Sequence, residues 1–364
     1  MRLRAFAGLL LALLFGCGAQ AQSPAPPGPK LVHRPPPKPP SLTREGRIRL
    51  DVAVSDAEGK PVAGLQPSDF RLTDQGRPAK ILSFRGFDGV VATPQPPVEV
   101  ILLIDEVNLP FQQVAFVRSE LTQFLRQNGG KLAQPTTLMR LTDKGVRVEP
   151  KPTLDGDALV KVVGQIKTDI GYINPAMGGD GSIERFQISA RGLATIAENE
   201  AAKPGRKLLV WIGPGWPMLE GTRFQSPDEI NKRRYFDAIV ELSNKLREAR
   251  ITVNSVSGIA ADPGSALFYQ QFLKGVRSPR EARSGNLALK VLAVQTGGRI
   301  LGPGNDLAAQ IDASIANANA FYSVSFNPPT GAKADEYHEL KVQIAKPGLT
   351  ARTNAGYYFE PPQN

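Results

Sequence analysis

The residues best placed for chemistry are acids that follow an apolar run. Residues 98–104 are almost all apolar, and Asp105 and Glu106 come directly after them. A pair of carboxylates can hydrolyse a glycosidic bond, and a cluster of oxygen ligands can hold a hard cation such as Mg²⁺. The spacing of Asp105 and Glu106 with Asp180 or Glu184 does not predict the separation that glycoside hydrolysis requires. We therefore expect a protein that is not an enzyme and keep a carboxylate-based glycan hydrolase as an alternative.

Composition restricts the other kinds of reactive centre. The 364 residues include two histidines, His33 and His338, and one cysteine, Cys17. One cysteine excludes an internal disulfide, and two histidines leave almost no room for a Ser-His-Asp triad or a multi-histidine metal centre. His338 stands between Tyr337 and Glu339 at the start of a predicted strand, and we expect it at the surface.

The N-terminus has the features of an export signal. Arg2 and Arg4 precede a short apolar run, residues 5–15, and small residues follow it. Two processing sites compete: Ala19–Ala21 fits a signal-peptidase site, whereas Leu14–Cys17 resembles a bacterial lipobox, which would attach a lipid to Cys17. We expect residues 1–21 to be a signal peptide and the protein to be exported, as a periplasmic, outer-membrane-attached or secreted form. Contact with a membrane would come only through a lipid on Cys17.

Charge and proline content describe the segment that follows. Residues 22–43 contain nine prolines between Pro24 and Pro40, which favours an extended tether. The chain carries a formal charge of +10, of which residues 1–44 contribute six positive charges and no acid. No basic stripe with interleaved aromatic residues follows, so we expect no nucleic-acid partner.

Two stretches with β-strand patterns flank the centre of the chain. In residues 44–92 the alternating segment 48–55 predicts a strand, and residues 70–72 and 81–84 predict two more, joined by a turn at 74–76. Residues 320–361 predict strands at 321–326, 340–344 and 351–358. Three strands are too few to be stable alone, so we expect the two stretches to pair as halves of one small antiparallel β-sandwich.

The central residues 98–319 show strands alternating with helices. Predicted strands occupy 98–104, 136–141, 146–148, 207–212 and 251–256. Predicted helices occupy 111–127, 159–166, 183–198, 226–250, 287–295 and 307–318. This alternation predicts βαβ units and a doubly wound, mostly parallel sheet. The expected fold class is therefore an α/β domain inserted between the halves of the β-sandwich.

Several segments, in this order, resemble the von Willebrand factor A (VWA)-related exported bacterial proteins of the acidobacterial type. They are IRLDVAVSDAEGKPVAGLQPSDFRLTDQGRPAKILSF from Ile48, VEVILLIDEVN from Val98, PGRKLLVWIGPGWP from Pro204, LAVQTGGRIL from Leu292, FYSVSFNPP from Phe321 and ARTNAGYYFEP from Ala351. The resemblance covers roughly residues 47–361. It implies a Rossmann-like VWA domain flanked by β structure, located outside the cytoplasm, and a role in adhesion or protein assembly.

The resemblance also implies where an adhesion-type Mg²⁺ site would lie. Its first aspartate matches Asp105, but the two serine positions fall on Val107 and Leu109, which offer no oxygen. The loop where another aspartate is expected is residues 213–216, Gly-Pro-Gly-Trp, and the threonine loop matches only loosely near Ser182. We expect a degenerate site with no metal and no cofactor, and keep a cation-dependent adhesion module as the first alternative.

Ligand contact is expected at the carboxyl edge of the sheet, where open α/β sheets bind their ligands. The residues of this predicted rim are Asp105, Glu106, Asn108, Asp180, Ser182, Trp216 and Met218. Two structural alternatives stay open: Asp105 could bond the loop backbone, and Trp216 could fold back onto the domain. The predicted function is an exported, envelope-associated adhesion or scaffold module that binds a protein partner.

Overall fold

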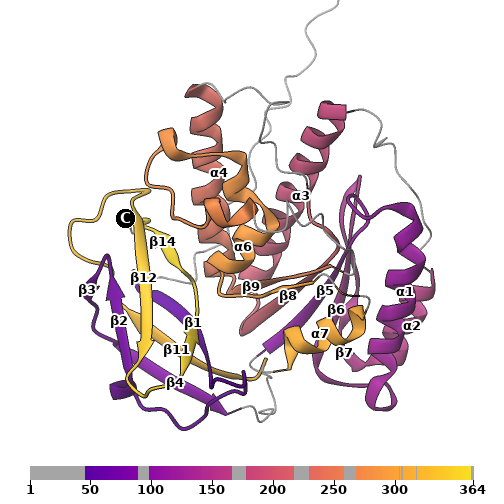
Figure 1. Cartoon of the computed structure of the whole chain (residues 1–364), viewed down its shortest axis with the longest axis horizontal. Coiled ribbons are helices and arrows are strands. Elements are labelled where there is room, and N and C mark those ends of the chain that lie inside the picture. The colour runs from indigo at the N-terminus through magenta and orange to yellow at the C-terminus, as the bar shows by residue number, and fades with distance from the viewer. Residues whose placement is uncertain are drawn as a thin grey trace, which may run out of the picture. The chain divides into compact units, whose positions relative to one another are not determined.

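The structure is a computed structural model that describes residues 46–88, 98–165, 178–216, 229–257, 268–302, 304, 306–316 and 318–361. The predicted signal peptide and tether lie outside these ranges. A six-stranded sheet covered by helices stands beside a β-sandwich (Figure 1). Within the described ranges no helix combines the length and the apolar character that crossing a membrane requires.

The central sheet has the doubly wound order that the alternation of strands and helices predicts. Its strands run β10-β9-β8-β5-β6-β7, and all neighbours are parallel except β6 and β7. If these six strands are numbered 1 to 6 along the chain and the sheet is read from β7, their order is 3-2-1-4-5-6. Dinucleotide-binding folds have the same order; here one edge strand is antiparallel. The strands are β5 (Val98–Asp105), β6 (Lys131–Thr142), β7 (Gly145–Asp155), β8 (Arg206–Ile212), β9 (Ile251–Val256) and β10 (Ile300–Leu301).

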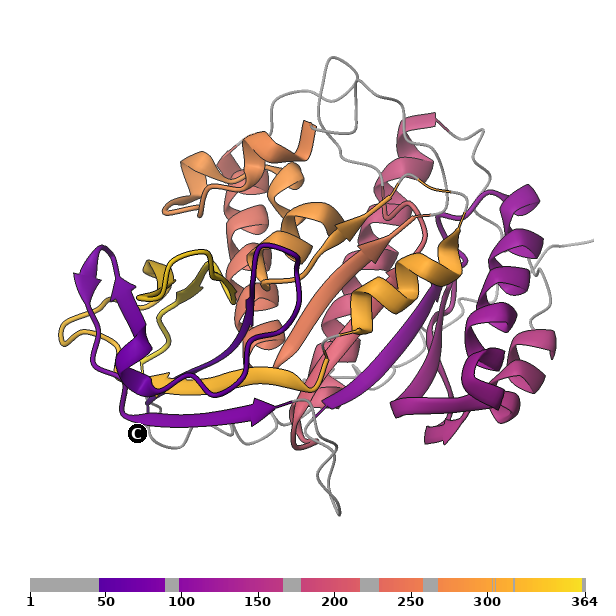
Figure 2. The same ribbon diagram turned by 60° about the horizontal axis from the view of Figure 1, so that its bottom comes forward.

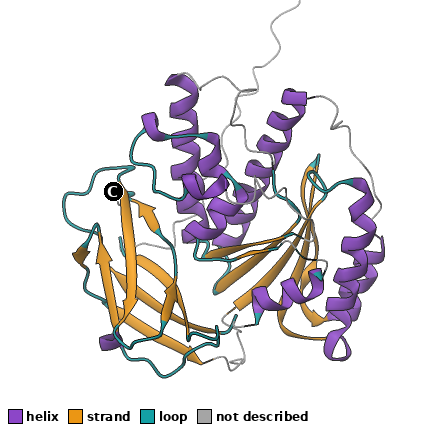
Figure 3. Ribbon diagram, in the orientation of Figure 1, coloured by secondary structure: helices purple, strands orange, loops and turns teal. Residues whose placement is uncertain are grey.

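Helices cover both faces of this sheet because its central strand is apolar on both sides. On β5, Ile101 and Leu103 pack toward α3, α4 and α6, whereas Leu102 and Ile104 pack toward α1, α2 and α7. The two helical layers lie on opposite sides of the sheet in Figure 3. The helices are α1 (Phe111–Arg126), α2 (Gly156–Gln165), α3 (Gly178–Ala201), α4 (Glu229–Glu248), α6 (Leu289–Gln295) and α7 (Leu307–Ile315). Among the described residues, short 3₁₀ turns lie at Pro67–Asp69, Gln127–Gly130, Phe268–Phe272, Pro279–Glu281 and Ser284–Leu287.

The β-sandwich is built from both ends of the described chain. Its two antiparallel sheets run β13-β1-β11-β4 and β14-β12-β2-β3, so each combines N-terminal and C-terminal strands. The strands are β1 (Ile48–Ser55), β2 (Phe70–Asp74), β3 (Arg77–Pro78), β4 (Ser83–Asp88), β11 (Ala320–Phe326), β12 (Tyr337–Ile344), β13 (Thr350–Arg352) and β14 (Gly356–Tyr358). Figure 2 shows β4 and β11 side by side along the base of the molecule. The predicted fold class, an α/β domain inserted in a split sandwich, is confirmed.

One predicted pairing in the sandwich is wrong. The expectation joined residues 70–72 and 81–84 as neighbouring strands, but β2 forms its hairpin with β3, and β4 pairs with β11 in the other sheet. The reason lies in the turn, where Gln75 and Gly76 have φ values of +50° and +76°. Two successive positive φ values are typical of a tight hairpin turn, which returns the chain onto β2 within two residues.

The prediction of an exposed His338 is also wrong. Its side chain is only 3% exposed, and its Nδ1 lies 2.8 Å from the carboxylate of Asp74. The hydroxyl of Tyr357 donates to the other oxygen of the same carboxylate at 2.7 Å, and the Tyr357 ring stacks on the imidazole. Asp74 and Tyr357 thus supply polar and aromatic contacts from two other strands, which local sequence around His338 does not reveal.

Candidate functional site

Asp105 ends the central strand β5 and is fully buried, with 0% of its surface exposed. It reaches this position because the neighbouring strand β8 is followed by Gly213. Gly213 has a φ of +148°, and a Cβ atom there would lie 2.9 Å from the Cβ of Asp105. Glycine therefore removes the side chain that would displace the aspartate from the edge of the sheet.

Nitrogen donors occupy both oxygens of the Asp105 carboxylate. The backbone N–H of Asn108 donates to Oδ1 at 3.0 Å, and the Asn108 side-chain amide donates to Oδ1 at 3.0 Å and to Oδ2 at 2.9 Å. The indole N–H of Trp211, on β8, donates to Oδ2 at 2.9 Å. The same Asn108 amide also donates to the hydroxyl of Ser189 on α3 at 3.0 Å. The strand, its loop, a neighbouring strand and a helix thus converge on one buried carboxylate.

Burial and hydrogen bonding oppose each other in setting the charge of Asp105. Burial raises the pKa of this carboxyl from 3.8 to about 6, because the anion has lost its water. The donors from Asn108, Trp211 and the backbone of Val107 favour the anion and limit the rise. Asp105 is therefore mainly ionised at neutral pH, but at an energetic cost that only neutral hydrogen-bond donors offset.

The donor set does not fit Mg²⁺. A hard cation needs several oxygen ligands around one point, but the side chains of Val107 and Leu109 are hydrocarbon and pack into the two cores. Asn108 Oδ1 is a buried oxygen without a hydrogen-bond partner, and one neutral amide oxygen does not replace the missing ligands. Across the described ranges, no group of three or more His, Cys, Asp or Glu side chains is placed to hold a metal ion. The Asn108 amide instead occupies the space beside the carboxylate.

The next residue of the predicted rim, Glu106, has a partner of its own. Arg140 on β6 holds it in a two-point ion pair, with one of the two contacts at 2.9 Å, and the two side chains are 10% and 13% exposed. The backbone N–H of Glu106 also donates to the carbonyl of Leu141 at 3.0 Å. These contacts fix Glu106 against β6 rather than directing it toward Asp105.

The prediction of Trp216 as an exposed contact residue is wrong. Its side chain is 5% exposed, and its indole N–H donates to the carbonyl of Leu287 at 3.1 Å. Its ring packs edge-to-face on Trp211, with 5.2 Å between ring centroids. The alternative in which Trp216 folds back onto the domain is correct, because Gly215, with a φ of +73°, turns the chain onto α6. Asp105, at 0% exposure, is also closed to solvent, because Asn108 and Trp211 pack against its carboxylate.

The remaining rim residues lie on α3 or outside the described ranges. Ser182 is half-buried, and its hydroxyl accepts a long hydrogen bond, 3.5 Å, from Arg185. Asp180 belongs to the first turn of α3, and Met218 lies outside the described residues. The hydroxyl that reaches the Asp105 network is Ser189, about 10 Å farther along the helix axis at 1.5 Å per residue. Sequence reasoning missed Ser189 and Trp211, because a serine inside a helix and a tryptophan inside an apolar strand both suggest ordinary packing.

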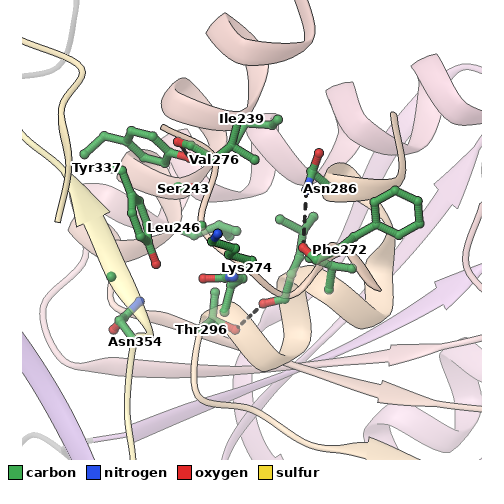
Figure 4. A pocket seen from close by; sticks show the side chains of 16 residues that line it. Ile239, Ser243, Leu246, Phe272, Lys274, Val276, Asn286, Thr296, Tyr337 and Asn354 are labelled. Atoms are coloured by element: carbon green, nitrogen blue, oxygen red, sulfur yellow. Dashed lines mark hydrogen bonds between the residues drawn. The ribbon is translucent and has the colours of Figure 1, made fainter. Parts of the chain in front are cut away.

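A crevice lies between α4, α6 and the C-terminal strands of the sandwich (Figure 4). Lys274, Thr296, Tyr337 and Asn354 surround it, and none of its described lining residues is Asp, Glu or His. Many of its polar groups bond within the protein: the Thr296 hydroxyl donates to the carbonyl of Leu292 at 2.9 Å. This crevice therefore holds no pair of carboxylates for hydrolysis.

Comparisons with known proteins give remote structural likenesses only. The sequence matches no protein-family model and no curated protein sequence. Among solved structures it is similar to manganese-loaded TRAP from Plasmodium vivax, with 12% identity, 75% of this chain and 96% of that chain covered, and a TM-score of 0.33. It is also similar to a von Willebrand factor type A protein from Catenulispora acidiphila, with 11% identity, 86% of this chain and 74% of that chain covered, and a TM-score of 0.29. A third is the human COPII-coat protein Sec24c, with 9% identity, 72% of this chain covered and a TM-score of 0.31; the chain spans 44% of that protein's length.

These likenesses are too remote to support a function, and the fold rests on the strand order of the chain itself. That order gives a Rossmann-like sheet with β structure before and after it in the sequence. This is the architecture that the resemblance to VWA-related proteins implies. The α/β domain is therefore VWA-like in its fold, and its sheet edge differs from the adhesion-type site at the serine and aspartate positions.

Proposed function

We propose that this chain is a non-enzymatic protein-binding module that works without a metal ion, through the carboxyl edge of its parallel sheet. The proposal includes that the chain belongs to the acidobacterial type of VWA-related exported proteins, which the order of the resembling segments supports. Charge and composition at residues 1–43 support export and attachment to the cell envelope. The proposal for the binding surface rests on three of the exposed apolar side chains of the α/β domain; others, Val148, Leu154 and Phe268, lie elsewhere on it.

Three helices carry an exposed apolar residue in the half that lies nearer this edge. Phe111 is the first residue of α1 and is 55% exposed; Ile230, the second residue of α4, is 65% exposed; Ile183, near the start of α3, is 37% exposed. Helix α1 follows the carboxyl end of β5, and α3 ends four residues before β8 begins, so both helices start at the carboxyl edge. In Figure 1 the upper ends of α1, α3 and α4 lie toward the same end of the strands, with α1 on one face of the sheet and α3 and α4 on the other.

Exposure of these three side chains costs free energy unless another surface covers them. Burying a side chain of this size contributes about 1.5 to 3 kcal/mol, and these three would act as apolar anchors within a larger interface. We name Phe111, Ile183 and Ile230 the apolar rim. At the same edge of the sheet, Asn108 and Trp211 donate hydrogen bonds to the carboxylate of Asp105, so this carboxylate is not free to bind a cation.

The enzyme alternative finds little support at the acids that follow β5 and at His338. Asp105 is inaccessible, Glu106 is paired with Arg140, and His338 is buried in the sandwich. A hydrolase needs two carboxyl groups that both reach the substrate. We therefore favour metal-free protein binding as the function, with cation-dependent adhesion as the first alternative and glycan hydrolysis as the second.

Site-specific cross-linking in intact cells tests this proposal. A photo-reactive amino acid is placed singly at Phe111, Ile183 or Ile230, and at Leu82 in the sandwich as a matched control, since Leu82 is also apolar and 42% exposed. We expect one discrete adduct with a second protein from the rim positions, absent from the Leu82 position and unchanged by a chelator of divalent cations. Equal labelling from all four positions, or none from the rim, would overturn the proposed surface.

A further inference from the structure

A second site lies at the opposite end of the sheet, where β8 and β9 begin. A crevice enclosing about 380 Å³, open solvent included, separates this end of the α/β domain from the sandwich strands β1 and β13. Three arginines line it: Arg206, the first residue of β8; Arg299, just before β10; and Arg352, the last residue of β13. None of its lining residues is acidic; the others are Ala53, Leu208, Thr252, Asn254, Gly297, Ala313, Ser314 and Ala318.

Arg206 is the buried member of this group. It is 5% exposed, its Nε has no hydrogen-bond partner, and its two other nitrogens make only long contacts, 3.4 Å to the carbonyl of Ala318 and 3.5 Å to the hydroxyl of Thr252. Its guanidinium also lies 5.0 Å from the centre of the Phe321 ring. A buried guanidinium normally has a carboxylate or a full set of acceptors, because an unpaired buried charge is costly.

The acid nearest to this group, Asp51, is already paired with another arginine, Arg250. Both carboxylate oxygens of Asp51 accept hydrogen bonds from Arg250, at 2.7 Å and 3.0 Å. Asp51 therefore acts on Arg206 only from a distance, and no described carboxylate forms an ion pair with any of the three crevice arginines.

The half-buried arginines at the mouth show the same imbalance. Arg299 donates from one nitrogen to the carbonyl of Ala313 at 3.1 Å, and the charges that act on Arg352 are those of two arginines, with no acid among them. The pKa of Arg352 is lowered to about 10, because of its burial and because the charges of Arg299 and Arg206 lie close by. Like charges brought together without a counter-charge indicate a position for an anion.

We propose that Arg206, Arg299 and Arg352 form a binding site for a phosphate group, carried either by inorganic phosphate or by a small phosphate monoester. Three guanidinium groups match the charge and the many acceptor oxygens of a phosphate dianion better than they match a single carboxylate. Thr252 adds a hydroxyl to the lining of the crevice. Because the site joins β8 and β13, a bound phosphate would also clamp the α/β domain to the sandwich.

The test measures thermal unfolding and binding heat of the full chain with millimolar inorganic phosphate, with glycerol 3-phosphate, and with chloride at the same ionic strength. We expect both phosphate compounds, or one of them, to raise the melting temperature by several degrees, since a ligand that binds only the folded state stabilises it. A larger effect of inorganic phosphate identifies the free anion as the ligand, and an equal or larger effect of glycerol 3-phosphate identifies a monoester.

Two variants and a matched control separate binding from general salt effects. Arg299→Gln and Arg352→Gln should each weaken phosphate binding at least about tenfold, whereas Arg49→Gln, an exposed arginine elsewhere on β1, should leave it unchanged. In phosphate-free buffer Arg352→Gln should melt no lower than the wild type, because it removes a repelling charge. A wild type that responds to phosphate no more than to chloride, or crevice variants that respond as the wild type does, would overturn the site.

Discussion

Replacing Asp105 by asparagine should change the pH dependence of stability in a way that no surface residue would. The carboxyl has a pKa of about 6 in the folded protein against 3.8 as its ordinary value, a difference of about 2 units, or about 3 kcal/mol. Because the folded-state pKa is raised, the folded state binds the proton more tightly than the unfolded state does. The stabilising effect of that proton is complete below pH 3.8 and is lost as the pH rises through 6.

Urea unfolding of the wild type and of Asp105→Asn at several pH values between 4 and 8 measures this directly. The wild type should gain about 2 kcal/mol relative to Asp105→Asn as the pH falls from 7 to 4, since the variant has nothing to protonate at this position and the unfolded carboxyl is already partly protonated at pH 4. Trp211→Phe, which removes the indole donor to Oδ2, should shift the midpoint of the profile to higher pH. A difference between wild type and Asp105→Asn that does not change with pH would refute the closed, desolvated carboxylate.

Three further predictions concern the sheet edge and the N-terminus. Asn108→Ala should destabilise the fold by about 3 kcal/mol in chemical denaturation and raise the pKa of Asp105 further, because the buried carboxylate loses its side-chain donor; an unchanged unfolding midpoint would contradict this. Trp216→Ala should cost about 4 kcal/mol, as expected for a large buried aromatic residue, and a variant that is as stable as the wild type would show that Trp216 is exposed. Cys17→Ser should release the protein from membranes in cell fractionation if Cys17 carries a lipid, and an unchanged distribution would favour cleavage after Ala21.

The fold was predictable because its strongest signals are local. The apolar run before Asp105 and the apolar segment 207–212 are typical of strands buried on both faces, and both lie in the middle of the sheet. The turn at 74–76 was predicted, but the strand β3 that follows it was missed, because two polar or proline residues, Arg77 and Pro78, show no strand pattern of their own.

The candidate site was predictable only at its first residue. The position of Asp105 follows from the end of an apolar strand, and the absence of oxygen at Val107 and Leu109 follows from their types. The partners of Asp105 could not be derived, because Trp211 reaches it through the register of two parallel strands and Ser189 through the rotation of a helix. Long-range register and helix phase leave no local trace in the sequence.

Titration of the full chain with Mg²⁺, Mn²⁺ and Ca²⁺, followed by calorimetry and thermal unfolding, tests most directly whether the sheet edge works without a metal ion. With Asn108 and Trp211 donating to both oxygens of Asp105, we expect no saturable heat and no change in melting temperature. Saturable binding that stabilises the wild type and disappears in Asp105→Asn would contradict this and show a working cation site.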